Sequence, residues 1–174
     1  AVRENRKQVS AVHKANIMKL SDGLFLECAR RVARDFPDIR YSEIIIDNCA
    51  MQLVTRPEQF DVLLMDNLYG DILSDLCAGL AGGLGVVPGS NIGTHCAVFD
   101  AVHGSAPDIA GKRVANPTAV ILSLAEMLDF VELPQVGANV RRAVYATLAN
   151  PANHTRDLGG SAGLDHITQA IIDN

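Results

Sequence analysis

The chain has 174 residues, of which 48% are hydrophobic and 20% charged, and its formal net charge is −5. This length and hydrophobic content support one ordinary domain or two small ones and argue against a disordered chain. The acidic balance disfavours a general nucleic-acid binder, because phosphate neutralisation requires a basic surface. The apolar runs are too short to span a bilayer, and no signal peptide is visible.

The four cysteines are widely spaced and form no CxxC pair. This pattern indicates reduced, mostly buried thiols of an intracellular protein rather than a zinc site. The chain starts at Ala1 in a charged stretch that soon becomes a predicted strand. We interpret this start as an internal cut, so that a targeting segment could precede the sequence.

The first half of the chain alternates short apolar strands with helical patterns, which is typical of an α/β fold. In chain order we expect a strand at 9–12, a helix at 17–36, a strand at 40–46, a short helix at 49–55, a strand at 61–65 and a helix after Gly70.

The second half begins with a glycine-rich stretch, in which six glycines lie between residues 79 and 93. We predict a domain crossover near Ala81. Asn116 followed by Pro117 is a good helix start, with Asn as the N-cap and Pro at the first helical position. The elements expected here are a strand at 97–99, a loop at 103–112, helices at 118–130 and 135–148, a polar loop at 150–163 and a helix at 164–172.

Two carboxylates, Asp71 and Asp75, stand four residues apart just after Gly70, at the expected start of a helix. Positions i and i+4 share a helix face, so the two side chains point the same way. One interpretation is that both carboxylates favour the positive end of the helix dipole. The other is that they hold a divalent cation through oxygen ligands.

Three predicted strands end in polar side chains, which are Lys14, Asp47 and the Asp71/Asp75 pair. Ligands of α/β sheets bind at the carboxyl ends of strands. Three carboxylates suit Mg²⁺ or Mn²⁺ better than zinc, and the lysine could stabilise an oxyanion or transfer a proton. Taken singly, Lys14 would be a surface lysine and Asp47 a strand-end cap. Their recurrence at one topological position gives the functional interpretation equal weight.

The glycine-rich stretch contains neither GxGxxG nor GxxxxGK[ST], so it lacks the Rossmann fingerprint and the P-loop and could be a hinge or a tightly packed segment. His103-Gly104 beside Asp108 could wrap a nucleotide, with Asp108 accepting hydrogen bonds from ribose hydroxyls. The alternative is that His103 is an ordinary polar loop residue.

A family resemblance is carried by residues 11–19 (AVHKANIMK), 67–75 (NLYGDILSD), 103–111 and 116–118. Together these segments resemble the β-decarboxylating dehydrogenases, a family that includes isocitrate, isopropylmalate and homoisocitrate dehydrogenases. The match covers essentially the whole chain in the family's motif order. Within the family, residues 13–26 are most similar to the NAD-dependent isocitrate dehydrogenases.

The resemblance implies the two-domain α/β fold of isocitrate and isopropylmalate dehydrogenases, of which this chain would be only the C-terminal portion. Residues 1–81 would finish the smaller domain, which makes the dimer interface and the metal site, and residues 82–174 the larger, nucleotide-binding domain. The implied reaction is oxidative decarboxylation of isocitrate to 2-oxoglutarate with NAD as hydride acceptor. The family's shared active sites imply a homo- or hetero-oligomer.

The resemblance also implies roles for the polar strand ends. Lys14 matches a catalytic lysine that reaches the neighbouring subunit's site and assists proton transfer. Asp47 matches a carboxylate lent across the dimer to the metal. Asp71 and Asp75 match metal ligands from the same chain, and the expected ion is Mg²⁺ or Mn²⁺.

The cofactor implied by the resemblance is NAD. A carboxylate at Asp108 accepts hydrogen bonds from free ribose hydroxyls and would repel a 2′-phosphate, which favours NAD over NADP. The matching positions are His103, Gly104, Asp108, Ile109 and Asn116 in the adenosine-binding loop, Asn16 and Gln52 near the nicotinamide, and Asp157 near the nucleotide.

Two departures from the family pattern bear on function. Asp66 stands where related sequences usually carry proline, glutamate or another residue, so a further negative charge could lie near the site. The family's N-terminal half is absent, and with it the serine, asparagine and arginines that hold the substrate carboxylates and a catalytic tyrosine. The isolated chain is therefore expected to be inactive.

Several alternatives stay open at this point. The enzyme could be a homoisocitrate or 3-isopropylmalate dehydrogenase, or a regulatory, non-catalytic subunit of a hetero-oligomeric isocitrate dehydrogenase. The retained Asp47, Asp71 and Asp75 favour a catalytic-type subunit. The resemblance implies the mitochondrial matrix for a eukaryotic source and the cytoplasm for a bacterial one, with neither a nucleic-acid nor a membrane partner.

Overall fold

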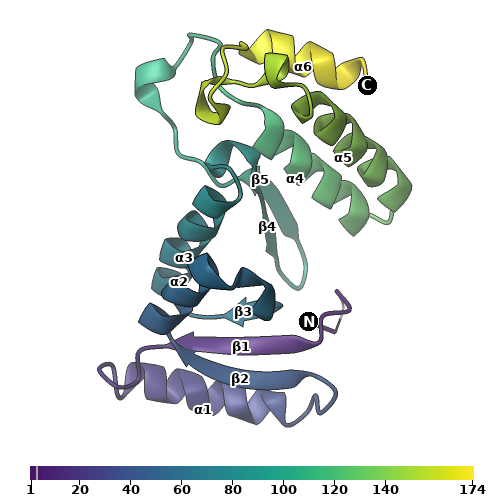
Figure 1. Ribbon diagram of the computed structural model, residues 1–174. Coiled ribbons are helices and arrows are strands. Elements are labelled where there is room, and N and C mark those ends of the chain that lie inside the picture. Colours follow the sequence, from purple (N-terminus) through teal and green to yellow (C-terminus); the bar gives the residue numbers. More distant parts are fainter. Residues whose placement is uncertain (3) are drawn as a thin grey trace. The chain divides into compact units, whose positions relative to one another are not determined.

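The computed structural model describes residues 1–2 and 4–174, which divide into two units, Ala1–Cys77 and Ala78–Asn174. The first unit is built on a three-stranded parallel sheet with the strand order β2-β1-β3 (Figure 1). Its elements are β1 (Gln8–His13), α1 (Ser21–Ala33), β2 (Arg40–Ile45), α2 (Ile46–Thr55), a 3₁₀ turn (Pro57–Gln59), β3 (Val62–Leu64) and α3 (Asn67–Leu80), the last of which continues past the division.

The central strand β1 is covered on both faces. Side chains of successive strand residues point to opposite faces of a sheet. Ala11 is fully buried in a cluster with Leu26 and Ala29 of α1, whereas Val12 is fully buried with residues of α2 and α3. Figure 1 shows α1 on one side of the sheet and α2 and α3 on the other. This layering of helices on both faces of a parallel sheet confirms the α/β class.

Helices α1, α2 and α3 of the first unit all differ in their bounds from the sequence prediction, and α3 begins at Asn67 instead of after Gly70. The helix expected at 17–36 occupies only Ser21–Ala33, because the backbone after β1 forms tight turns in which the Lys14 carbonyl accepts hydrogen bonds from the amides of Ile17 and Met18. The helix expected from Cys49 begins at Ile46 instead, so Asp47 lies in its first turn and not in the preceding loop.

The second unit combines an antiparallel hairpin with three helices. Helices α4, α5 and α6 share a core of Leu122, Val144, Ile167 and Ile171. Its elements are β4 (Pro88–Ile92), β5 (Ala97–Ala101), α4 (Thr118–Phe130), α5 (Pro134–Leu148), α6 (Leu164–Ile172) and 3₁₀ turns at Leu84–Val86, Pro107–Ile109, Pro151–Asn153 and Arg156–Leu158. The helices predicted at 118–130 and 164–172 are confirmed at those bounds, and the one predicted at 135–148 starts one residue earlier.

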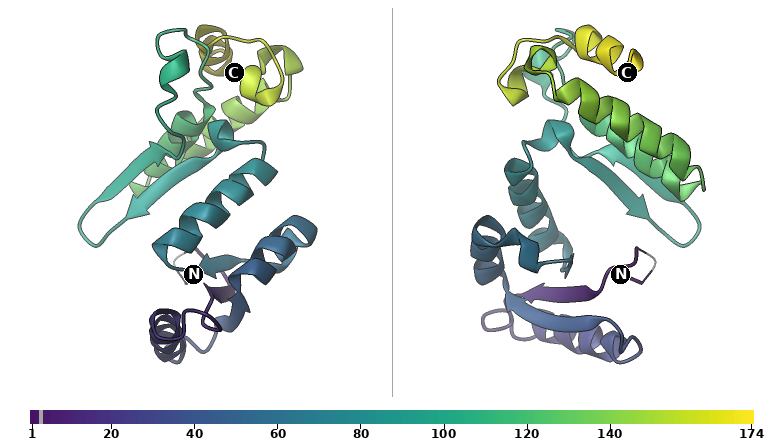
Figure 2. Two further views of the ribbon diagram at one scale, coloured as in Figure 1. Left: turned by 90° about the vertical axis from the view of Figure 1, so that its left-hand side faces the viewer. Right: turned by 45° about the vertical axis from the view of Figure 1, so that its right-hand side comes forward.

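Strand β4 lies in the glycine-rich stretch and was not predicted. Gly89 pairs with Asp100 of β5, and a Cβ atom at Gly89 would come within 2.9 Å of the Asp100 carbonyl oxygen. Glycine is therefore required here by the close approach of two backbones and not by a hinge. Helix α4 lies against the hairpin (Figure 2). The Ser123 hydroxyl donates a hydrogen bond to the Asp100 carbonyl at 2.8 Å.

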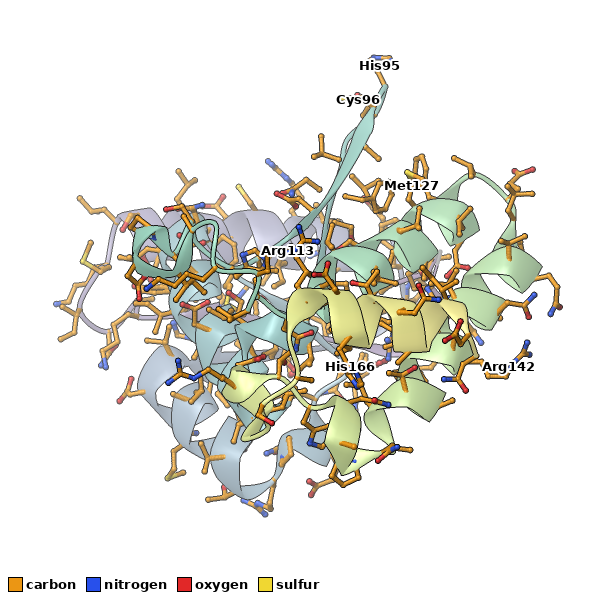
Figure 3. All side chains as sticks on the ribbon, turned by 90° about the horizontal axis from the view of Figure 1, so that it is seen from above. His95, Cys96, Arg113, Met127, Arg142 and His166 are labelled. Atoms are coloured by element: carbon orange, nitrogen blue, oxygen red, sulfur yellow. The ribbon has the colours of Figure 1, made fainter. Side chains whose placement is uncertain are left out.

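The exposed end of the hairpin carries His95 and Cys96 (Figure 3). In the same unit, Arg113 forms two hydrogen bonds with Asp165 of α6, which ties the loop before α4 to the last helix. Among the helices that the structure describes, none combines the length and the apolar character needed to cross a membrane.

Candidate functional site

The carboxyl ends of β1 and β2 bring Lys14 and Asp47 together. The parallel register pairs His13 with Ile45, the last residues of the two strands. Lys14 follows His13 directly, and Asp47 lies in the first turn of α2. The Lys14 Nζ atom donates a hydrogen bond to Asp47 Oδ1 at 2.5 Å. Two polar strand ends singled out from the sequence therefore meet at one edge of the sheet.

This ion pair is open to solvent on its carboxylate side. The Asp47 side chain is 68% exposed, whereas the Lys14 side chain is 28% exposed. The hydrogen bond from Lys14 lowers the pKa of Asp47 below its ordinary value, and a backbone hydrogen bond at Asp47 acts in the same direction. The carboxylate is therefore ionised at neutral pH, which is the form that binds a cation.

The other two carboxylates lie on α3, but not at its start. The helix begins at Asn67, and Asp66 caps it, because Asp66 Oδ1 accepts a hydrogen bond from the Tyr69 amide at 3.0 Å. Asp71 and Asp75 follow in the second and third turns and are exposed. The prediction that they occupy the first helical turn was wrong, since Gly70 continues the helix instead of preceding it.

The observed positions of Asp71 and Asp75 on α3 favour one of the two interpretations of the pair. The helix dipole acts mainly within the first turn, so it gives little reason for carboxylates at Asp71 and Asp75. Asp66, the residue expected to add negative charge near the site, satisfies the helix start instead. The adjacent like charges of Asp71 and Asp75 then lack a local structural explanation, which strengthens the cation interpretation.

The described part of a single chain does not assemble a complete three-ligand site. Among the described residues, no three histidine, cysteine or acidic side chains are close enough to hold one metal ion. Asp47 contacts Lys14, and Asp71 and Asp75 remain apart from it on α3. The donor chemistry fits Mg²⁺ or Mn²⁺, since all three groups are hard oxygen ligands.

Two further residues of the first unit were predicted to lie near the nicotinamide. Asn16 is exposed in the turn after Lys14, and Gln52 is half-buried on α2. Gln52 Nε2 donates a hydrogen bond to Asn48 Oδ1 at 2.9 Å, one helical turn back toward Asp47. Their role toward a nucleotide stays a prediction.

The second unit carries the predicted adenosine-binding loop. His103 Nδ1 lies 3.0 Å from the Gly104 carbonyl oxygen. Ala106 adopts a left-handed backbone conformation with φ of 40°, which turns the chain into the 3₁₀ turn that holds Asp108 and Ile109. Asp108 is exposed, so its carboxylate is free to accept hydrogen bonds from a ligand.

Asn116 and Asp157, from distant parts of the sequence, are joined directly. The N-cap position of α4 is Pro117 and not Asn116 as predicted, because the helix begins at Thr118. Asn116 Oδ1 still accepts a hydrogen bond from the Thr118 amide at 3.0 Å. Its Nδ2 donates to Asp157 Oδ2 at 2.9 Å, and the buried Thr155 hydroxyl donates to Asp157 Oδ1 at 2.6 Å. A Cβ atom at Gly85 would overlap the same Asp157 carboxylate, so glycine leaves room for this contact.

Sequence reasoning missed Asp22, which contacts the Lys14 amide, and Tyr69, which contacts Asp22. Asp22 is 5% exposed and accepts hydrogen bonds from the Lys14 amide and the Tyr69 hydroxyl. An acidic residue in the first turn of a helix is common, so nothing in the sequence indicated a buried role for Asp22. The contact with Tyr69 spans 47 positions and depends on the tertiary fold.

Comparisons with known proteins cover the whole chain. A family model described as isocitrate/isopropylmalate dehydrogenase matches residues 1–174. The chain is 54% identical over 170 residues to isocitrate dehydrogenase [NAD] catalytic subunit 5, mitochondrial, of Arabidopsis thaliana, an alignment that covers 97% of this chain and 46% of the relative. It is also 54% identical over 168 residues to isocitrate/homoisocitrate dehydrogenase of Thermus thermophilus, with coverage of 97% and 50%.

Solved structures give the same result. Isocitrate dehydrogenase from Methylococcus capsulatus matches with a TM-score of 0.94 and 49% identity, covering 99% of this chain and 52% of that chain. A β-decarboxylating dehydrogenase from Thermococcus kodakarensis matches with a TM-score of 0.84 and 41% identity, covering 99% and 50%. This chain spans about half the length of the curated relatives it matches.

Proposed function

The chain belongs to the isocitrate/isopropylmalate dehydrogenase family, and we propose that it forms the C-terminal half of an NAD-dependent isocitrate dehydrogenase. The reaction is the oxidative decarboxylation of isocitrate to 2-oxoglutarate. The observation that carries this proposal is the contact between Lys14 Nζ and Asp47 Oδ1, which places a proton donor and an ionised carboxylate at one sheet edge. The 54% identity to a relative named isocitrate dehydrogenase [NAD] supports the choice of substrate and cofactor.

Three carboxylates would hold the divalent cation. Asp71 and Asp75 of one chain face outward from α3, and Asp47 of a second chain would complete the set, because one chain alone does not bring the three together. When bound, Mg²⁺ or Mn²⁺ would act as a Lewis acid on the oxygen of the substrate's hydroxyl-bearing carbon. The proposal therefore requires a dimer, or a larger homo- or hetero-oligomer, with shared sites.

Lys14 would move protons at the substrate. Its ammonium group lies beside Asp47 and would reach the same neighbouring site as that carboxylate. There it would assist removal of the proton from the substrate hydroxyl and return a proton to the carbon that loses CO₂. The half-buried lysine stem and the fixed backbone around Lys14 hold the ammonium group in place for both steps.

The nucleotide would bind along the loop of the second unit. Asp108 would accept hydrogen bonds from the adenosine ribose, with His103, Gly104 and Ile109 beside it. The joined pair of Asn116 and Asp157 would hold the far side of this loop. NAD supplies the hydride acceptor for the oxidation. Asn16 and Gln52 are the positions we assign to the nicotinamide side.

Domain and source assignments follow from the same proposal. Residues 1–81 would complete the smaller domain and residues 82–174 the larger, nucleotide-binding domain. The Arabidopsis relative is named mitochondrial, and we propose that compartment for this chain if its source is eukaryotic. The retained Asp47, Asp71 and Asp75 favour a catalytic subunit over a regulatory one.

Homoisocitrate is the second candidate substrate, because the Thermus relative named isocitrate/homoisocitrate dehydrogenase is as similar to this chain as the Arabidopsis one. Isocitrate and homoisocitrate differ in chain length. The residues that would discriminate between these lengths are not among those whose contacts are described above. A direct comparison of kcat/KM for isocitrate, homoisocitrate and 3-isopropylmalate decides among them.

The proposed function is tested on what we call the two-domain enzyme. This is the chain within its complete protein, or a chimera in which the N-terminal half of the Thermus relative precedes residue 1. We expect NAD reduction with isocitrate and Mg²⁺ from the two-domain enzyme. Absence of turnover with all three acids, in a folded and dimeric preparation, would overturn the proposal.

The isolated 174-residue chain serves as the matched control. We expect it to be inactive and to associate, since α4 exposes apolar side chains such as Val120 at 52% and Leu124 at 42%. Light scattering and the same assay measure both properties. A stable monomer with appreciable turnover would contradict the shared-site assignment.

A further inference from the structure

Asp22 is a buried carboxylate at the junction of three segments. It lies in the first turn of α1, and 5% of its surface is exposed. Its Oδ2 accepts hydrogen bonds from the Lys14 amide at 2.7 Å and from the Tyr69 hydroxyl at 3.0 Å. Its Oδ1 accepts one from the Ser21 hydroxyl at 3.0 Å. These donors belong to the turn after β1, to α3 and to α1 itself.

The electrostatics of Asp22 favour an ionised carboxylate. Burial raises the pKa of its carboxyl, but the hydrogen bonds from Lys14, Ser21 and Tyr69, together with the charge interaction with His13, outweigh this effect and keep the pKa below its ordinary value. A buried carboxylate is tolerated only when donors replace its lost hydration. Hydrogen bonds to an ionised acceptor are also stronger than neutral ones, so the three segments are held firmly.

The Lys14 backbone is fixed from both sides by these contacts. Its amide donates to Asp22, and its carbonyl accepts from the amides of Ile17 and Met18, each at 2.8 Å. Because the Lys14 backbone is fixed, only the side-chain torsions of Lys14 determine the position of its ammonium group, which contacts Asp47. Tyr69 connects the same carboxylate to α3, two residues before Asp71.

We propose that Asp22 is a positioning residue that sets the Lys14 backbone against the first turns of α3. It does not touch the substrate and acts through the Lys14 amide and the Tyr69 hydroxyl. This role rests on the proposed function of Lys14 as the proton-transfer group. Without the Asp22 carboxylate, the turn after β1 loses its hydrogen-bonded link to α1 and α3. The Lys14 backbone is then no longer fixed, and the position of the ammonium group becomes variable.

The first variants are Asp22→Asn and Tyr69→Phe in the two-domain enzyme, with Glu27→Gln as the matched control, since Glu27 is an exposed acid on the same helix. Displacing a reacting group by about 1 Å can cost on the order of 10²-fold in rate, so we expect Asp22→Asn to lower kcat by about 10- to 100-fold. KM for NAD should stay within about twofold, the mark of an effect on the chemical step. Tyr69→Phe keeps two of the three donors to Asp22 and should lower kcat less.

A double variant separates positioning from general damage to the fold. If Asp22 acts through Lys14, then Asp22→Asn combined with Lys14→Met should be no slower than Lys14→Met alone. Multiplicative losses in the double variant, or an unchanged kcat in Asp22→Asn, would overturn the proposal. Thermal unfolding of each variant shows whether the protein is folded. If Asp22→Asn does not fold, Tyr69→Phe provides the test instead.

Amide hydrogen exchange gives a readout that does not depend on the substrate. The Lys14 amide should be protected in the wild type and should exchange at least about tenfold faster in Asp22→Asn, because its acceptor is weakened and the turn opens locally. Glu27→Gln should leave it unchanged. If no substrate is turned over, the proposed function fails while faster exchange still supports the anchor. If the wild-type enzyme turns over its substrate but exchange of the Lys14 amide is unchanged in Asp22→Asn, the role of Asp22 is refuted and the proposed function stands.

Discussion

Arg30 of α1 holds Glu43 of β2 through two parallel hydrogen bonds, Nε to Oε1 and Nη2 to Oε2, each of 2.7 Å. The Tyr41 hydroxyl donates a further hydrogen bond to Glu43 Oε1 at 3.0 Å. A planar guanidinium group matches a carboxylate in this bidentate way. The contact fastens α1 to the edge strand of the sheet, on the face opposite α2 and α3.

The first prediction concerns the pH dependence of this contact. The hydrogen bonds from Arg30 lower the pKa of Glu43 in the folded protein. A carboxyl group with a depressed folded pKa stabilises the fold above its unfolded pKa of about 4.3 and loses that effect as pH falls through the folded value. Glu43→Gln should therefore lower the unfolding temperature at pH 7, by a few degrees at most because the pair is partly exposed.

Thermal unfolding of the two-domain enzyme at pH 7 and at about pH 3, below the unfolded pKa, measures this difference. The gap between wild type and Glu43→Gln should shrink at the lower pH. An equal gap at both values would mean that packing, and not the ion pair, accounts for the effect. Asp35→Asn, which alters an exposed acid just after α1, serves as the charge control.

The second prediction concerns the metal ligands. Asp71→Asn in the two-domain enzyme should abolish Mg²⁺-dependent turnover, because an amide is a much weaker ligand for a hard cation than a carboxylate. The exposed position on α3 leaves the fold intact. Turnover and Mn²⁺ binding are measured side by side. Asp66→Asn is the control, since asparagine also caps helices well; turnover that survives in Asp71→Asn would remove Asp71 from the metal site.

The third prediction concerns proton transfer. Lys14→Met should reduce kcat by roughly 10²-fold or more, the usual scale for loss of a general acid–base group. The apolar replacement keeps the length of the stem that is now 28% exposed. Steady-state kinetics across isocitrate concentrations separate kcat from KM. A change confined to KM would make Lys14 a binding residue instead.

The fourth prediction concerns cofactor choice. Asp108→Lys together with Ile109→Tyr should weaken NAD use and improve NADP use, because the exposed carboxylate that repels a 2′-phosphate is replaced by a cation. The shift in relative kcat/KM could correspond to a few kcal/mol. Both cofactors are compared in the parent and the variant. Equal use of NAD and NADP by the parent would contradict the role given to Asp108.

The sequence predicted the fold correctly where the hydrophobic periodicity agrees with the residues that begin or end an element. Pro117 placed the start of α4, and alternating strands and helices gave the α/β class. It failed where tertiary contacts set the local structure. The turns after Lys14 are held by a hydrogen bond to Asp22, and they delay the start of α1. The glycine-rich stretch forms β4 because the backbone of β5 pairs with it so closely that a side chain at Gly89 would not fit.

The site followed the same division. Lys14 and Asp47 were predicted from their topological position, since parallel strands end at one edge, and the structure brings them together. Asn116 and Asp157 were assigned to the nucleotide site only through the family resemblance, and their contact with each other was not predicted. Asp22 and Tyr69 had no signal, because a hydrogen bond across 47 positions leaves no periodic trace in the sequence.

The strand order β2-β1-β3 also determines when the site can form during synthesis. The strand that leads to Lys14 is made before both of its neighbours in the sheet, and β3 lies more than forty residues downstream of it. Until then β1 has two free edges, a state that is prone to wrong pairing and slow to resolve in parallel sheets. The hydrogen bonds around Asp22 that fix Lys14, the residue we assign to proton transfer, are therefore complete only after Tyr69 has been synthesised.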